Sequence, residues 1–150
     1  MIGSRSRTCG WLGLAVIGVW LIGALWLEGA ARTGPTVDEV TLENVPPVVV
    51  KTVPEAGAAD VDPKLTEIKV TFSKEMTDKS WSWVIVAEEN YPKTTDEPRF
   101  QPDEKTCVLP VKLEAGKTYA LWLNRDPFTS FRDADGRSAV PYLLVFRTRR

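Results

Sequence analysis

Neighbouring carboxylates are the residues of this sequence that come closest to a catalytic pattern. Three pairs follow one another in the stretch 88–105: Glu88 and Glu89, Asp96 and Glu97, and Asp103 and Glu104. Glycosidases need only two carboxyl groups, one of which stays protonated because its surroundings raise its pKa. The stretch is polar and offers no apolar surroundings that would raise a pKa. It therefore predicts a solvated acidic loop and no catalytic pair.

The segment 133–136, with the sequence DADG, matches part of a calcium-binding EF-hand loop. A complete loop also needs an acid two residues before the first aspartate and a glutamate at its twelfth position. Phe131 and Tyr142 stand at those positions, so the EF-hand is excluded. Because Asp and Gly favour turns, we expect an Asp-rich turn, with Asp133 and Asp135 as metal candidates of low specificity. The sequence predicts no bound metal and no cofactor.

Histidine is absent from the 150 residues, and the only cysteines are Cys9 and Cys107. Without an imidazole there is no Ser–His or Cys–His nucleophile pair and no His-ligated metal, so we do not expect an enzyme. Cys107 stands in the sequence TCVL, which predicts a buried thiol rather than a reactive one. The net charge of −1 gives no indication of nucleic-acid binding.

Tryptophans are the remaining candidates for binding a ligand. Trp122 is out of phase with Tyr119, Leu121 and Leu123, so it should leave the core face of its strand. An exposed Trp122, together with Trp81 and Trp83, could bind sugar rings or a protein partner. The alternative is packing: Trp81 and Trp83 would fill the core, and Trp122 would lie under the loop 127–131.

The segments that must position these residues are short β-strands. Apolar and polar residues alternate or form β-branched runs, which predicts strands at 48–53, 67–73, 81–87, 106–111, 118–123 and 142–148, with a short edge strand at 99–100. Glycine-containing turns separate several of them, and no amphipathic helical period follows residue 28. The segment 81–87 is apolar on both faces, so we expect it to be central or covered on its second side. The pattern predicts an all-β fold, an antiparallel β-sandwich of about seven strands.

An apolar run at residues 11–27 sets the N-terminal part apart from this domain. As a helix it would span about 25 Å, near the lower limit for crossing a membrane. Arg5 and Arg7 precede it, so the positive-inside rule keeps the N-terminus in the cytoplasm and exports the rest. The length of the run and its flanking tryptophans favour a membrane anchor, whereas the small residues 29–31 suit cleavage of a signal peptide. Both interpretations export the domain, either on a single-pass inner-membrane protein or as a secreted or periplasmic one.

The chain is thus expected to have three parts. Residues 1–31 form the signal peptide or anchor helix, which is the contact with the membrane. Residues 32–46, rich in Gly, Pro, Thr and acids, form a linker, and residues 47–150 form the β-sandwich domain.

Two groups of motifs then carry a resemblance to a known family. The opening group is TVPEAG at 52–57, VDP at 61–63 and IKVTFSKEM at 68–76; the closing group is GKTY at 116–119 and YLLVFRT at 142–148. They resemble the bacterial Ig-like domain of the S-layer (SbsA) type, in which P-x-x-G-x-x-x-V precedes a strand ending F-S-x-x-M. The resemblance covers about residues 46–149 and implies an Ig-like sandwich with a structural or adhesive role and no catalytic residues.

The sequence therefore predicts an exported, non-enzymatic Ig-like module at the bacterial cell envelope. Its role would be adhesion, spacing or protein–protein interaction, with an envelope protein as partner and no nucleic acid. The alternative is an accessory domain that binds a glycan or another ligand through an exposed aromatic face containing Trp122.

Overall fold

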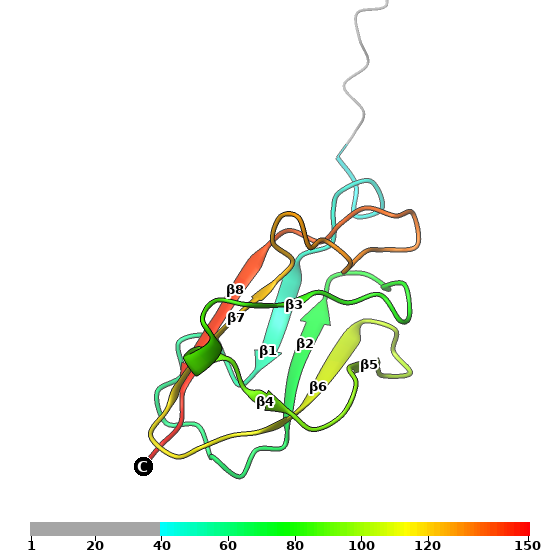
Figure 1. The fold of residues 1–150 in the computed structure, drawn as a ribbon. Coiled ribbons are helices and arrows are strands. Elements are labelled where there is room, and N and C mark those ends of the chain that lie inside the picture. The colour runs from blue at the N-terminus through cyan, green and yellow to red at the C-terminus, as the bar shows by residue number, and fades with distance from the viewer. Residues whose placement is uncertain (1–39) are drawn as a thin grey trace, which may run out of the picture. The chain divides into compact units, whose positions relative to one another are not determined.

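The computed structural model describes residues 40–150, and these form an all-β domain (Figure 1). The expected N-terminal signal or anchor helix and most of the expected linker lie outside the described residues. In the described part, no helix is long and apolar enough to cross a membrane. The elements in chain order are β1 (Val49–Val53), β2 (Glu67–Phe72), β3 (Trp83–Ile85), the 3₁₀ turn η1 (Glu88–Asn90), β4 (Lys93–Thr94), β5 (Arg99–Phe100), β6 (Thr106–Lys112), β7 (Thr118–Leu123) and β8 (Tyr142–Arg147).

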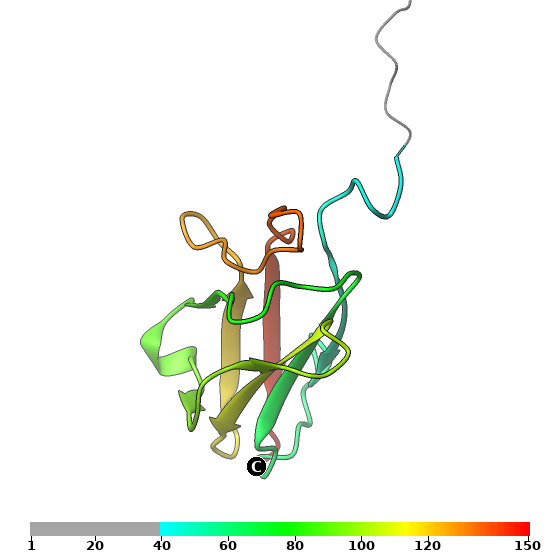
Figure 2. The same ribbon diagram turned by 90° about the vertical axis from the view of Figure 1, so that its right-hand side faces the viewer.

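The strands form two antiparallel sheets. One has the order β1-β2-β6-β4, with β5 also paired to β6, and the other has the order β3-β7-β8. Figure 2 shows the sheets from the side, with η1 and β4 (light green) on the side of the domain away from β1. The predicted all-β fold with antiparallel sheets is confirmed. The described residues contain eight strands rather than about seven, because the acidic stretch supplies β4, which its polar sequence does not signal, as well as the expected β5.

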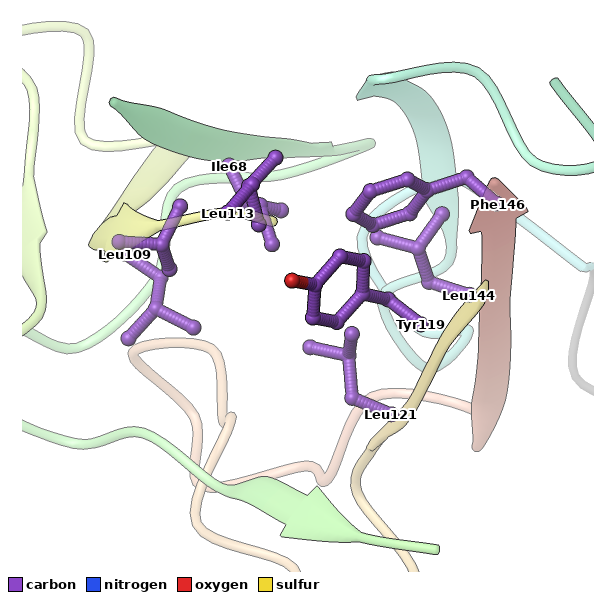
Figure 3. Close-up of a cluster of buried hydrophobic side chains, with 8 residues drawn as sticks. Ile68, Leu109, Leu113, Tyr119, Leu121, Leu144 and Phe146 are labelled. Atoms are coloured by element: carbon purple, nitrogen blue, oxygen red, sulfur yellow. The ribbon is translucent and has the colours of Figure 1, made fainter. Parts of the chain in front are cut away.

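The alternating pattern of the strands explains the shared core. Every second side chain of β2 and of β7 is buried, and these side chains meet those of β6 and β8 between the sheets. Tyr119 lies in the middle of this cluster, with its ring centre 5.4 Å from that of Phe146 (Figure 3). Its hydroxyl accepts a hydrogen bond of 2.8 Å from the backbone N–H of Glu114, five residues upstream. A tyrosine at the start of this strand that bonds back to the preceding corner is typical of Ig-like sandwiches.

The outer edge of β8 is covered by the chain that connects β1 to β2. The N–H of Gly57 donates to the Val145 carbonyl at 2.7 Å, and the N–H of Val61 donates to the Arg147 carbonyl at 3.0 Å. Gly57 adopts a φ of +84°, which glycine tolerates better than other residues, and this turn brings the connection alongside β8. The sandwich is therefore closed on this side by backbone hydrogen bonds.

The opposite side of the three-stranded sheet differs from the sequence prediction. The expected strand 81–87 is shortened to β3, which pairs with β7 and has no second neighbour among the described residues. Of the two arrangements expected for it, the central position is therefore wrong. Both faces of β3 are apolar for different reasons. Trp83 faces the core, whereas Val84 lies directly opposite Trp122 of β7 and shares the outer face with it.

Candidate functional site

A groove of about 930 Å³ runs between β3 and the segment 91–98, which leads from η1 through β4 toward β5. Trp81, Trp83 and Ile85 line one wall, Leu109 of β6 contributes to it, and Tyr91 belongs to the opposite segment. The groove exists because the two sheets end there at different edges, β3 in one and β4 in the other. No segment of the described chain closes this gap as the β1–β2 connection closes the other side.

Ile85 shows most directly that the sandwich is open here. It lies opposite the buried Leu121 and so shares the inner face of the sheet, yet 42% of it is exposed. Phe128, from the loop after β7, also lines the groove and is 60% exposed. Exposed apolar side chains beside a groove are typical of binding surfaces rather than of a finished core.

The structure places the two predicted tryptophans Trp81 and Trp83 together in this groove. Trp83 also packs against both core clusters, and its ring meets Phe131 edge-on with centres 5.6 Å apart. Its indole N–H is buried and makes no hydrogen bond within the described residues. Trp81 is partly buried against the second cluster. Both tryptophans therefore pack against the core, as one of the two sequence alternatives predicts, and both also line the groove.

Trp122 lies elsewhere. It projects from the outer face of β7, out of phase with the buried Leu121 and Leu123 as expected, and is half-buried between Val84 and Leu143 on the neighbouring strands. The guanidinium of Arg125 stands over its ring at 5.8 Å, within the range of a cation–π contact. Trp122 thus does not join Trp81 and Trp83 in one aromatic face.

The segment that borders the groove is acidic. Asp96 and Glu97 line it, and Glu88 and Glu89 are exposed in η1 just after β3, whereas Lys93 is the only basic residue of this segment. Within the described residues none of these four carboxylates makes an ion pair. These four carboxylates are solvated, as the sequence predicts, and Asp96 and Glu97 give the groove a negative border.

The metal candidates Asp133 and Asp135 are engaged by basic side chains of the protein itself. Asp133 is 3.1 Å from the ammonium of Lys74, and Asp135 pairs with Arg137. In residues 40–150, no group of three or more His, Cys, Asp or Glu side chains could hold a metal ion. Ion pairs with Lys74 and Arg137 therefore hold this turn in place.

Cys107 is buried between the sheets, as its sequence context predicts. Burial raises the pKa of its thiol to about 12. A thiol with this pKa is almost entirely protonated at neutral pH and is a poor nucleophile.

This gives a direct labelling prediction. In a Cys9→Ser chain, where Cys107 is the only thiol, alkylation by iodoacetamide at pH 8 should be at least about a thousandfold slower in the folded protein than in urea. The rates are measured by intact mass against time. Rates within tenfold of each other would contradict the buried, protonated thiol.

The groove contains residues that sequence analysis did not single out, among them Ile85, Tyr91 and Phe128. Tyr91 stands inside the polar acidic stretch, and burial raises the pKa of its hydroxyl. In the sequence, Tyr91 is an aromatic residue isolated among charged ones, and this pattern does not predict where its side chain lies in the fold. Their shared location depends on which strands form the sheet edges.

The family pattern of the bacterial Ig-like domain matches residues 43–148, which is most of the described chain. The chain belongs to the bacterial Ig-like domain family. The family resemblance predicted from the motifs is thus confirmed, although the match does not distinguish the SbsA type. No curated protein is similar enough to count as a relative.

Two solved structures of the S-layer protein SbsC are similar to this chain. Domains 1–6 of the surface layer protein SbsC share 19% identity with a TM-score of 0.46, over 71% of this chain and 14% of that one. The S-layer protein rSbsC(31–844) shares 20% identity with a TM-score of 0.45, over 70% of this chain and 14% of that one. The chain therefore corresponds to only a small part of each of these proteins.

Proposed function

We propose that this protein is an exported, non-enzymatic Ig-like module that works at the bacterial cell envelope by binding another protein. The observation that supports this role best is the open groove beside β3, with exposed apolar side chains and an acidic border. Its described carboxylates and its thiol are solvated, ion-paired or buried, so none has the surroundings of a catalytic group. Membership of the bacterial Ig-like family agrees with a binding or spacing role.

Export is tested by the location of the C-terminus. We expect a C-terminal tag on the full chain to be digested by protease added to intact spheroplasts, because the positive-inside rule places residues 32–150 outside the cytoplasm. The matched control is Arg5→Glu with Arg7→Glu, which removes the basic flank and should increase the protected fraction. A tag that is fully protected in the unaltered chain would contradict the proposal.

The intact mass of the same protein separates the two forms of export. A mass corresponding to the whole chain in the membrane fraction supports the anchor. A chain starting at Ala30, Ala31 or Arg32 supports a cleaved signal peptide.

A glycan-binding module is the second candidate, because the groove combines Trp81 and Trp83 with the carboxylates of Asp96 and Glu97. Indole rings stack on sugar rings and carboxylates accept hydrogen bonds from sugar hydroxyls. In this form the sugar would lie in the groove rather than on Trp122, whose ring carries Arg125. Glycan-array binding that is lost in Trp81→Ala and retained in Trp122→Ala would support it.

A further inference from the structure

The outer edge of β3 presents unused backbone groups to the groove. The N–H of Asn124 donates to the Ser82 carbonyl at 3.1 Å, which marks these two residues as a hydrogen-bonded pair of the β3–β7 ladder. In an antiparallel ladder such pairs recur every second residue, so Val84 bonds across to β7. Trp83 and Ile85 therefore point their N–H and C=O groups away from β7, and no hydrogen bond from another described residue reaches them.

Two other sheet edges, those of β8 and β1, are covered or protected. The edge of β8 is covered by the β1–β2 connection. The strand β1 has an irregular register between Val49 and Lys51 and is closed by Pro54, and an edge lysine, a bulge and a proline all discourage pairing with another strand. The strand β3 carries none of these features: its three residues are Trp, Val and Ile.

The groove has the shape and lining that an added strand needs. It lies between β3 and the short edge strand β4, whose Thr94 also lines it. It adjoins a second hollow of about 460 Å³, and the two hollows have Trp81, Glu97 and Pro98 in common. An elongated hollow beside an unpaired strand suits an extended chain, whose alternate side chains would enter the apolar floor at Trp83 and Ile85.

The charged residues at the groove indicate which side chains the bound peptide should carry. Among the described residues that line the groove, the charged ones are Asp96 and Glu97, and neither makes an ion pair. The adjacent Arg99 is already paired with Glu67 at 2.6 Å. A ligand with lysine or arginine side chains outside its apolar ones would complement this border.

We propose that an extended peptide segment of a partner protein, apolar at alternate positions and bearing lysine or arginine between them, adds to β3 as a fourth strand of its sheet. The backbone of Trp83 and Ile85 pairs with the peptide, the groove takes its apolar side chains, and the acidic border meets its basic ones. This inference rests on the proposed function and names the class of partner.

The test uses the full chain in mild detergent and a fluorescent nonapeptide that alternates valine with lysine as the probe. Two matched peptides serve as controls: one with glutamate in place of lysine, and one N-methylated on alternate amides so that one edge cannot form hydrogen bonds. We expect the lysine peptide to bind in fluorescence anisotropy and each control to bind at least about tenfold more weakly. Absence of binding by the lysine peptide would overturn the proposal, as would equal binding by the N-methylated one.

The protein variant Ile85→Pro removes one outward N–H without removing a bond to β7, and proline is tolerated on the free side of an edge strand. We expect Ile85→Pro to lower the affinity for the lysine peptide at least about tenfold. Ile85→Val keeps the N–H, so its affinity for the peptide should be within twofold of that of the unaltered chain. If Ile85→Pro does not fold, as judged by circular dichroism, Glu97→Gln replaces it. The Glu97→Gln variant should bind the peptide less tightly than the unaltered chain at low salt and about equally tightly at high salt.

The remaining outcomes separate the occupants of the groove. Displacement of the probe by a neutral oligosaccharide, or a dimer of the chain that dissociates when the probe is added, would assign the groove to a glycan or to a second copy and overturn the inference. Export is measured independently by protease accessibility. A chain that is exported but does not bind the peptide would therefore refute only this inference, whereas a cytoplasmic domain would refute the proposed function.

Discussion

Replacing Asn124 with alanine is expected to lower the free energy of unfolding by about 3 kcal/mol. Asn124 is completely buried and connects the chain at position 124 to the backbone at positions 131 and 139. Its amide NH₂ donates to the carbonyls of Phe131 and Ala139, each at 3.0 Å, and its carbonyl accepts from the N–H of Phe131 at 3.0 Å. In the alanine variant, the Phe131 N–H and the Ala139 carbonyl lose their partner inside the protein, and each buried unsatisfied group costs about 1–3 kcal/mol.

Asn124 also has a φ of +56°, which asparagine tolerates better than alanine. The control is therefore Asn124→Gly, which removes the same side-chain hydrogen bonds but tolerates the positive φ. We expect the glycine and alanine variants to lose stability to within about 1 kcal/mol of each other, measured by urea unfolding followed by far-ultraviolet circular dichroism. A glycine variant as stable as the unaltered chain would show that backbone strain, and not the loss of the buried hydrogen bonds, accounts for the effect.

The hydrogen bonds of Asn124 also help to position residues that line the groove. It fixes Phe131, and the segment just before it carries Phe128 and Ser130, which line the groove. The N–H of Ser130 in turn donates to the hydroxyl of Ser82 at 2.8 Å, beside β3. The hydrogen bonds around Asn124 therefore hold one end of the groove in place.

The strands were predictable because their signal is local. Ile68, Val70 and Phe72 alternate with polar residues, and burial on one face of a sheet requires that period. The position of β3 was not predictable in the same way. Its apolar residues suit a central strand, but in the sheet order β3-β7-β8 no strand of the described chain pairs with its other side.

The candidate site was predictable only in part. Trp81 and Trp83 were identified because tryptophans are few and conspicuous, but the groove that they line depends on where both sheets end. The importance of Asn124 gives no local signal, because its partners lie 7 and 15 residues away across a loop. Each strand can be predicted from its own sequence pattern, but a site of this kind depends on how the strands are arranged relative to one another.

Asp133 illustrates how a turn that resembles a metal loop in sequence serves a different purpose. Only 5% of its side chain is exposed, and it accepts a hydrogen bond of 2.8 Å from the N–H of Arg137. The ammonium of Lys74, 14% exposed, lies 3.1 Å away and also donates to the carbonyl of Glu43 at 2.9 Å. Burial alone would raise the pKa of Asp133, but the hydrogen bonds and the positive charges of Lys74 and Arg137 outweigh it and hold the pKa below its usual value.

This lowered pKa predicts that the protein loses stability in acid. The unfolded chain takes up a proton at Asp133 near pH 4, whereas the folded chain does so only at lower pH. The carboxylate therefore contributes its full stabilisation above about pH 4 and loses it as the pH falls through the folded-state pKa. Asp133→Asn keeps the shape and removes the charge, so it should lower the free energy of unfolding by about 2 kcal/mol at pH 7, because Lys74 is left largely buried without its counter-ion.

The decisive measurement is the difference between Asp133→Asn and the unaltered chain, taken by urea unfolding from pH 7 down to pH 2. This difference should shrink toward zero in acid, since both proteins then lack the charge at position 133. Other carboxylates with lowered pKa values, such as Glu67 and Asp103, titrate in both proteins and cancel in the comparison. The matched control is Asp135→Asn, which touches the same Arg137 from a side chain that is 66% exposed and should cost at most about 1 kcal/mol. A difference that stays constant with pH would mean that the asparagine disturbs the turn by its shape and that the charge of Asp133 adds nothing to the fold.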